Sequence, residues 1–423
     1  MIKNNLKNKF VKNVVIVASG TAGAQAITML FSPIITRLYG PEAFGVMGTF
    51  SAMINMIIPI AALTYPIAIV LPKRDDDAQG IVKLSMLVSL ILSIISLIII
   101  LLFREPLANL FNFKNISMYL YFIPVIIIFS GFMQVLEQWM IRTKQFSINA
   151  KATLYQSLIV NISKVGIGFF YPIAQVLVFF TAIANGLRGT LMYLFSDKNI
   201  SFKSNKSVNI KQLAQKHYDF PVYRAPQDLI DSASQGVPVI MLTTFFGPAA
   251  AGFYTIGRTV LRLPTNLIGK AVGDVFYPRI AEAAINKEDV AGLIRKATFS
   301  LAIVGIIPFG VVMLFGPFLF SLVFGSDWEM AGEYARWISI WSYFAFMNRP
   351  SVRTLPVLNA QKFHLIWTIL WTALRIGLLA FTYYLSKDDL LSIAVFCISG
   401  TISNALLISI TIRLSRKRMM KYE

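Results

Sequence analysis

Eight basic side chains lie within long apolar segments of this sequence, where an uncompensated charge is expensive. They are Lys164, Arg188, Arg224, Arg258, Arg262, Lys270, Arg349 and Arg375. An Arg or Lys at the centre of a membrane-spanning helix costs about 2.5–3.5 kcal/mol on insertion scales. We therefore expect these side chains to face a water-filled cavity, an acidic partner or a bound anion. Guanidinium groups hold carboxylate and phosphate oxygens through paired N–H donors, so the chemistry on offer is anion binding.

Depth within the apolar segments separates these candidates. Arg258 and Arg262 are four residues apart and share one helix face. At 1.5 Å per residue they lie roughly 12 and 18 Å from the start of their segment near Ala250. Arg375 lies near the middle of a later segment, and Arg349 is similarly deep in the segment before it. We predict ligand-binding roles for Arg258, Arg262, Arg375, Arg349, Lys164, Arg188 and Arg224.

For several of the eight basic residues a role other than ligand binding is also open. Arg224 and Lys270 lie within about a turn of a segment end, where a long side chain can reach water. Lys164 and Arg188 are the counterparts in the first half of the chain. For Arg262 and Arg375 we weigh a structural ion pair against ligand binding. Ligand binding is favoured because few acidic residues lie in the apolar segments.

Three of those acidic residues are candidates for coupling transport to an ion gradient, namely Asp228, Asp231 and Glu137. Arg224, Asp228, Asp231 and Gln235 follow one another at spacings that place them on one helix face. One interpretation pairs Arg224 with Asp228 near the membrane surface. The other makes Asp231, about a third of the way in, a proton or sodium site.

Several kinds of chemistry are excluded by the residues available. The single Cys397 permits no intramolecular disulfide, and two His residues cannot build a His-rich metal site. No phosphate-binding loop or hydrolase motif occurs, so we predict no ATP site, no metal and no cofactor. The acidic run at residues 75–77 is interpreted as a solvated loop.

The composition predicts the elements that position these residues. The chain has 423 residues, of which 56% are hydrophobic and 14% charged, whereas a soluble domain has about 25% charged residues. The net charge of +19 does not indicate nucleic-acid binding, because the Lys and Arg residues separate apolar blocks. We predict an all-α polytopic membrane protein with twelve transmembrane helices. The spans are 13–36, 42–70, 81–103, 116–140, 147–171, 173–196, 223–246, 250–277, 294–325, 333–357, 362–385 and 389–412.

Basic residues also predict the orientation. With twelve spans, 26 Lys and Arg residues fall in the terminal and loop segments on one side and 5 on the other. The positive-inside rule then places both termini in the cytoplasm. We interpret the first apolar stretch as a retained helix and not as a signal peptide, since apolar sequence continues to Ile35.

Two motifs indicate an internal duplication. Tyr39-Gly40-Pro41 and Phe246-Gly247-Pro248 each join two spans, at an offset of about half the chain. A second pair of matches, Leu102-Phe103 with Pro106 and Leu314-Phe315 with Pro317, has a similar offset. We predict a six-helix lobe at 1–197, a cytoplasmic linker at 198–216, a second six-helix lobe at 217–412 and a basic cytoplasmic tail at 413–423. The two lobes are duplicated halves.

Longer motifs resemble those of a known family. They are the run Phe246 to Tyr254, Arg258 and Arg262-Leu263-Pro264, Val275 to Pro278, Leu322 to Gly325 with Trp328, and Pro33 to Gly45. Together they resemble the O-antigen and capsule flippases of the multidrug/oligosaccharidyl-lipid/polysaccharide exporter superfamily. The resemblance implies the two-lobe exporter fold in a bacterial cytoplasmic membrane and a cationic cavity.

The resemblance also implies a cargo and a site. The cargo would be an undecaprenyl-pyrophosphate-linked oligosaccharide, moved by alternating access for polysaccharide biosynthesis. Membrane lipid and a polymerase or assembly complex would be the partners. Arg258, Arg262 and Arg375 match the family's basic residues, whereas the first span has no Lys or Arg between Lys12 and Arg37, so its contribution would be polar, such as Gln25, or absent.

Two other functions stay open at this point. A multidrug antiporter of the same superfamily would export cations and should have an acidic cavity. A membrane polymerase or glycosyltransferase would need a large external loop, and every predicted external loop is short. We therefore favour a transporter over an enzyme. Five Trp residues near the tenth and eleventh spans, Trp341 among them, are interpreted as membrane-interface anchors.

Overall fold

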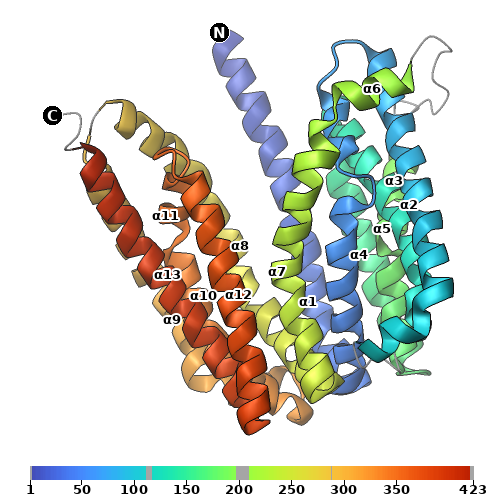
Figure 1. Cartoon of the computed structure of the whole chain (residues 1–423), viewed down its shortest axis with the longest axis vertical. Helices are drawn as coiled ribbons and strands as arrows, with labels where there is room; N and C mark the ends of the chain where they lie inside the picture. Colours follow the sequence, from blue (N-terminus) through green and yellow to red (C-terminus); the bar gives the residue numbers. More distant parts are fainter. Residues whose placement is uncertain (1, 111–116, 197–208, 287, 420–423) are drawn as a thin grey trace. The chain divides into compact units, whose positions relative to one another are not determined.

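The computed structural model describes residues 2–110, 117–196, 209–286 and 288–419, with the side chains of 2–15, 17–18, 107–110, 266–275, 277–278 and 417–419 left aside. Over these ranges the regular structure is helical (Figure 1). Helices suit apolar segments of this length because each helix satisfies its backbone N–H and C=O groups internally. The chain divides into two compact units, Met1–Thr244 and Phe245–Glu423.

The first unit is built from long helices that pack side by side. They are α1 (Ile2–Ile57), α2 (Asp75–Leu110), α3 (Phe122–Arg142), α4 (Phe146–Gly168), α5 (Ala174–Phe195) and α7 (Ala225–Phe246), with the short α6 (Ile210–Lys216). Helix α1 packs along α4, and α3 packs between α2 and α5. A buried cluster that includes Val135, Leu136 and Met140 of α3 forms a core of this unit.

The second unit has a central helix, α10, surrounded by its neighbours. Its helices are α8 (Pro248–Ile285), α9 (Val290–Phe324), α10 (Glu329–Met347), α11 (Arg349–Thr354), α12 (Gln361–Ser386) and α13 (Asp389–Met419). Helix α10 packs against α8, α9 and α13, and α12 packs along α13. Tyr334 and Phe346 of α10 are fully buried.

Each of the twelve predicted spans overlaps a long helix, but the second span, 42–70, continues past the end of α1 at Ile57, and the tenth, 333–357, covers both α10 and the short α11. Among the described residues, eight helical stretches are long and apolar enough to cross a membrane. One of these, Ser19–Ile60, contains the first two predicted spans. The more polar helices α4, α8 and α10 account for the other three spans. The prediction of an all-α polytopic membrane protein is confirmed.

The duplicated Gly-Pro motifs adopt the same backbone conformation. Gly40 has φ 69° and ψ 173°, and Gly247 has φ 89° and ψ 173°. A positive φ is readily available only to glycine, and the following Pro41 or Pro248 starts the next helix with a favourable φ. The same two-residue device therefore ends one helix and begins the next in both halves of the sequence.

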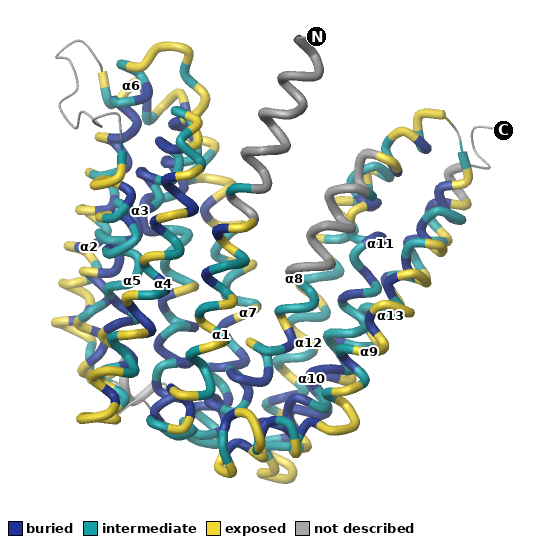
Figure 2. The backbone as a smooth tube through the Cα atoms, turned by 180° about the vertical axis from the view of Figure 1, so that it is seen from behind, coloured by how far each residue is buried: buried dark blue, intermediate teal, exposed yellow. Residues whose placement is uncertain are grey.

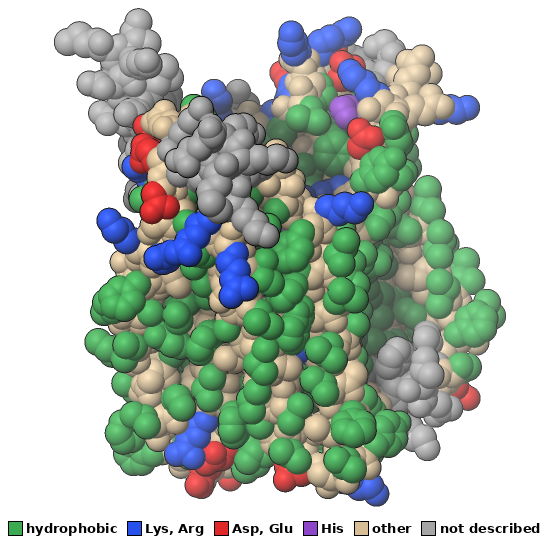
Figure 3. Space-filling view, turned by 60° about the vertical axis from the view of Figure 1, so that its left-hand side comes forward, with side chains coloured by type: hydrophobic (Ala, Val, Ile, Leu, Met, Phe, Trp, Pro, Cys, Tyr) green, Lys and Arg blue, Asp and Glu red, His purple; other side chains and the backbone are tan. Residues whose placement is uncertain are grey.

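The outer surfaces of the helices are strongly apolar. Leu102 of α2 is 68% exposed and Ile307 of α9 is 73% exposed, a pattern that a soluble protein avoids. Exposed positions recur along the outward sides of the helices in Figure 2. On the surface shown in Figure 3, hydrophobic side chains cover the middle of the helices and basic side chains gather toward one end. Lipid tails are the solvent that such a surface requires.

Helix α7 packs with the first compact unit. Ile240 packs against the cluster around Val46 and Phe50 of α1, and the hydroxyls of Thr243 and Thr49 are hydrogen-bonded to each other. The compact units thus divide near residue 244, whereas the predicted lobes divide at the linker 198–216. Residues 198–208 lie outside the described ranges. The lobe boundaries concern duplication of the sequence and not packing, and they stay a prediction.

Candidate functional site

Three of the predicted ligand-binding arginines gather in the second unit. Arg258 and Arg262 lie one turn apart on α8, and Arg375 lies on α12. Arg258 interacts electrostatically with both of the other guanidinium groups. The phenol of Tyr254, one turn before Arg258, interacts electrostatically with all three. We call Arg258, Arg262 and Arg375 the arginine cluster.

Arg375 is held by aromatic rings and a backbone carbonyl. Its guanidinium carbon lies 4.1 Å from the centre of the Trp341 ring and 3.9 Å from that of Phe396. Its Nε donates a hydrogen bond of 3.2 Å to the carbonyl oxygen of Phe396. Ring faces attract a cation without neutralising it. Arg375 forms no ion pair with any carboxylate in the described ranges, so its positive charge stays available.

Helix α13 comes very close to Arg375 and Trp341 at Gly400, which has no side chain. A Cβ atom added at Gly400 would lie 2.8 Å from the Arg375 guanidinium carbon and 2.8 Å from Cδ1 of Trp341. Only a glycine lets the backbone come this near. Gly400 therefore belongs to the site, although the sequence analysis did not identify it.

Buried polar atoms near the arginine cluster are left without hydrogen-bond partners. They include Nη2 of Arg375, Oη of Tyr254 and Oγ1 of Thr255. Most buried polar atoms in folded proteins have a partner, so unsatisfied ones mark places where water or a ligand can bind. Tyr254 and Thr255 precede Arg258 on α8; Tyr254 is the last residue of the motif Phe246 to Tyr254, whereas no motif marks Thr255.

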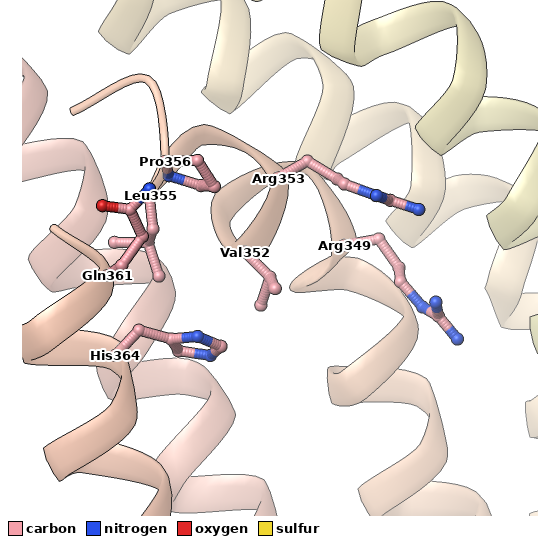
Figure 4. Close-up of a pocket in the computed structure, with 7 residues that line it drawn as sticks. All are labelled: Arg349, Val352, Arg353, Leu355, Pro356, Gln361 and His364. Carbon is pink, nitrogen blue, oxygen red and sulfur yellow. The ribbon is translucent and has the colours of Figure 1, made fainter. Parts of the chain in front are cut away.

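Arg349 lies apart from the arginine cluster. Its electrostatic neighbour is Arg353, four residues later on the short helix α11. Both side chains line a separate cavity (Figure 4). The structure therefore brings together the α8 and α12 arginines but places Arg349 in a second basic environment.

In the first unit, Arg188 and Glu137 are each other's partners. Nη2 of Arg188 lies 3.1 Å from Oε1 of Glu137 and donates to Oδ1 of Asn149 at 2.8 Å. Both charged side chains are less than one third exposed. The ion pair joins α3, α4 and α5, and Asn149 as its third member was not expected from the sequence.

Lys164 is half-buried on α4. Its Nζ lies 3.8 Å from the sulfur of Met47, and its backbone carbonyl accepts a 2.7 Å hydrogen bond from the hydroxyl of Tyr39. Tyr39 directly precedes the Gly-Pro kink of α1. Lys164 thus lies beside the first copy of the duplicated motif.

The polar stripe of α7 forms partly as the sequence indicated. Nε of Arg224 lies 3.2 Å from the carboxylate of Asp228, which is the predicted i, i+4 pair. Asp231 is exposed, and its backbone oxygen accepts hydrogen bonds from Ser234 and Gln235. A short π-helix at Phe220–Arg224 precedes α7, and Pro238 lies within it. Both a π-helical turn and a proline inside a helix are typical of a helix that bends.

Trp341 differs from its predicted role. The sequence analysis interpreted it as an interface anchor, whereas its ring lies against Arg375 and packs edge-to-face on Phe396. Trp367 and Trp371 on α12 lie 5.5 Å apart between ring centres, and Trp367 donates to Ser403 of α13. Within the described ranges, no three His, Cys, Asp or Glu side chains gather as a metal site would require.

Comparison with known proteins identifies a family that matches this sequence. A family model described as "Polysaccharide biosynthesis protein" matches residues 34–333. The chain is 20% identical over 325 residues to the succinoglycan biosynthesis transport protein ExoT of Rhizobium meliloti (strain 1021). That match covers 74% of this chain and 61% of ExoT, so the chain spans less than two thirds of this curated relative.

Solved structures show the fold. A multidrug resistance MATE family transporter of the MOP superfamily, in an inward-facing conformation, has a TM-score of 0.75 at 14% identity, over 94% of this chain and 95% of that one. The lipid II flippase MurJ, in an inward closed conformation, has a TM-score of 0.74 at 13% identity, over 94% and 87%. The twelve-helix, two-lobe exporter-superfamily fold that the sequence predicts is confirmed.

Proposed function

Because the chain belongs to the family of polysaccharide biosynthesis proteins, we propose that it is a flippase for a lipid-linked oligosaccharide. Its cargo would be an oligosaccharide repeat unit on undecaprenyl pyrophosphate, moved across the bacterial cytoplasmic membrane to build an O-antigen or capsule. The observation that carries this proposal is the arginine cluster of Arg258 and Arg262 on α8 and Arg375 on α12. Such clustering of like charge is stabilised when an anion binds.

The chemistry of the cluster matches a pyrophosphate head group. Each guanidinium can donate two parallel N–H bonds to phosphate oxygens. Arg375 uses only Nε for the Phe396 carbonyl and keeps its Nη groups for other acceptors. Ring faces and a carbonyl hold it in place before the cargo arrives, which lowers the entropic cost of binding.

The other basic candidates would act less directly. Arg188 and Arg224 already have carboxylate partners in Glu137 and Asp228. We assign them an electrostatic role in drawing the cargo toward the membrane protein. Lys164 remains a candidate for a direct contact from the first half of the chain.

Energy would come from an ion gradient or the membrane potential, because the sequence has no nucleotide-binding motif. Alternating access would expose the site to each side of the membrane in turn. Asp231 is the first candidate for a coupling carboxylate, since it is exposed on a helix that contains a proline. Asp228 and Glu137 already face an arginine and are second candidates.

Both termini would lie in the cytoplasm. In the first unit the N-terminus and α6 lie at the same end, and α6 carries Lys211 and Lys216 (Figure 1). In vesicles of known sidedness, protease should therefore remove tags at both termini only when added from the cytoplasmic side. Protection of one tag would overturn the twelve-span orientation.

A multidrug antiporter is the second candidate, because a MATE family transporter shares the fold. The two functions differ in the charge of the cargo. A site with three arginines should repel a cationic drug and attract a pyrophosphate. An enzyme of polysaccharide assembly is disfavoured by the transporter fold of the structural relatives.

The test is translocation by the purified protein in sealed vesicles. A fluorescent polyprenyl-pyrophosphate oligosaccharide is added to one leaflet, and a membrane-impermeant quencher reports its arrival in the other. We expect protein-dependent movement of this lipid and at least tenfold slower movement of a neutral polyprenyl glycoside. Uptake of a cationic dye without movement of the pyrophosphate lipid would favour the antiporter and overturn the proposal.

A further inference from the structure

A separate cavity in the second unit has a strongly basic lining. Its volume is about 400 Å³, and it lies between α11, the turn that follows, and the start of α12. Its lining residues are Arg349, Val352, Arg353, Leu355, Pro356, Gln361 and His364. In Figure 4, the two arginine side chains extend from α11 in the same direction, on one side of Val352, and His364 approaches from α12 on the other.

No acidic side chain among the described residues of the lining balances these charges. The lining contains no Asp or Glu. Arg349 and Arg353 form no ion pair or hydrogen bond with any residue that the structure describes, and each lies in the other's electrostatic field. Two like charges one helical turn apart destabilise a helix. An arrangement that costs stability and has no internal partner is typical of a binding site for the opposite charge.

The donors in this cavity suit a phosphate group. Arg349 and Arg353 offer guanidinium N–H groups on one side of Val352, whereas Gln361 and His364 lie on its other side, so the two arginines are the donors that a single phosphate would contact. Phosphate has several acceptor oxygens, which is more than a single carboxylate can offer to this set. The volume admits one or two phosphoryl groups with the adjoining part of a larger molecule.

Position along the helices separates this cavity from the arginine cluster. Arg349, the first residue of α11, follows Trp341 of α10, the partner of Arg375, by eight residues, which is roughly 12 Å at the helical rise. His364 precedes Arg375 on α12 by eleven residues, roughly 16 Å. The cavity and the cluster are therefore two sites within one unit. His364, Trp367, Trp371 and Arg375 follow one another on a single face of α12.

We propose that the cavity between α11 and α12 is a second binding site for a phosphate-bearing anion, independent of the arginine cluster. The phosphate could belong to the pyrophosphate of the cargo or to the head group of an anionic membrane lipid. Both present the same oxygens to Arg349 and Arg353. Only the cargo assignment rests on the proposed function.

The binding test uses inorganic pyrophosphate and the purified full-length chain. Isothermal titration should detect sites that Arg353→Gln and Arg349→Gln each weaken at least tenfold. The matched control is Lys362→Gln, which removes a positive charge beside Gln361 but does not line the cavity. We expect its binding to equal that of the wild type. Arg353→Lys, which keeps the charge without the planar fork, should give an intermediate affinity.

Unchanged pyrophosphate binding in Arg353→Gln and Arg349→Gln would overturn the inference. Folding of each variant is checked by its thermal melting temperature and by the pyrophosphate sites that remain. If both variants fail to fold, Arg353→Lys decides, because equal affinity in that variant and the wild type would contradict recognition by the guanidinium fork.

Two competition arms identify the source of the phosphate. In nanodiscs of phosphatidylcholine, addition of phosphatidylglycerol should displace pyrophosphate if the ligand is a membrane lipid. A polyprenyl pyrophosphate should displace it at much lower concentration if the ligand is the cargo. Loss of pyrophosphate binding in Arg353→Gln together with normal flipping in arginine-cluster variants would refute the proposed function and leave this site standing. Unchanged pyrophosphate binding in Arg353→Gln together with slow flipping in the arginine-cluster variants would refute this site alone.

Discussion

The guanidinium carbon of Arg375 lies 4.1 Å from the centre of the Trp341 ring, and Phe396 covers it at 3.9 Å. Arg375 therefore has two aromatic partners and a carbonyl, but no carboxylate partner among the described residues. A structural arginine within a membrane helix would be expected to have an acidic partner, as Arg188 does in Glu137. This contrast is the reason why we propose Arg375, and not Arg188, as a residue that contacts the cargo directly.

Replacing Trp341 should loosen Arg375 without removing its charge. A cation–π contact is worth about 0.5–2 kcal/mol, so we expect Trp341→Leu to slow translocation by about two- to thirtyfold. Trp341→Phe should recover part of that loss because it keeps an aromatic face. The measurement is the initial rate of lipid movement in vesicles. Equal rates for Leu, Phe and the wild type would show that the ring does not position Arg375.

Removing the charge of Glu137 should lower stability. Arg188 would keep Asn149 as a partner and lose its carboxylate, at a cost of about 1–2 kcal/mol. Glu137→Gln should therefore melt at a lower temperature than the wild type. The double variant Glu137→Gln/Arg188→Gln should lose less free energy of unfolding than the sum of the losses in the two single variants, because the two side chains interact. If the losses of the two single variants simply add up in the double variant, the ion pair contributes nothing to stability. If Glu137→Gln has normal stability but its transport rate responds differently to an ion gradient, Glu137 is a coupling residue.

Asp231→Asn tests the coupling carboxylate. If Asp231 binds the driving ion, the variant should move cargo at the same rate with and without an imposed proton or sodium gradient. The wild type should accelerate under one of the two gradients. Asp327→Asn, an exposed carboxylate on the short helix Ser326–Trp328, serves as the control. A gradient response in Asp231→Asn equal to that of the wild type would exclude the residue.

His217 makes the segment around α6 sensitive to acid. Burial lowers the pKa of His217 below its ordinary value of 6.5, and the positive charge of Lys216 lowers it further, while Asp219 opposes the shift. The unfolded segment then takes up a proton at a higher pH than the folded one. Stability from the neutral imidazole is full above pH 6.5 and is lost as the pH falls through the lowered pKa.

Amide hydrogen exchange of residues 209–224 measures this effect. After correction for the intrinsic rate, protection should decrease between about pH 7.5 and about pH 5.5 in the wild type. His217→Phe keeps a ring beside Phe220 and cannot titrate, so its protection should not change. The same decrease in both proteins would assign the acid sensitivity to other groups.

Much of the fold is predictable from the sequence because membrane helices have a strong compositional signal. Apolar length locates the spans, and the Gly40-Pro41 and Gly247-Pro248 pairs locate two helix breaks. The signal weakens for α4, α8 and α10, which are not among the eight stretches of the described residues that are long and apolar enough to cross a membrane. Packing is less accessible, and the association of α7 with α1 depends on contacts between residues nearly two hundred positions apart, such as Thr49 with Thr243.

The candidate site is only partly predictable. Burial cost identifies the arginines, and the i, i+4 spacing identifies the pair Arg258 and Arg262. The environment of Arg375 is not predictable, because Trp341, Phe396 and Gly400 come from two other helices and have no motif in common. The sequence shows more arginines than acidic residues in the predicted spans, but it does not show which arginine forms an ion pair with an acidic residue. Only the fold shows that Arg188 does.

We propose above all that the arginine cluster binds the pyrophosphate of a lipid-linked oligosaccharide. The most direct test is the translocation rate of the fluorescent lipid in vesicles that contain Arg262→Gln, Arg375→Gln or the control Lys387→Gln. Lys387 lies exposed at the end of the same helix as Arg375, so the control removes the same charge outside the site. We predict at least tenfold slower movement in the two cluster variants at normal melting temperature, with the control unchanged. Wild-type rates in both Arg262→Gln and Arg375→Gln would contradict the account.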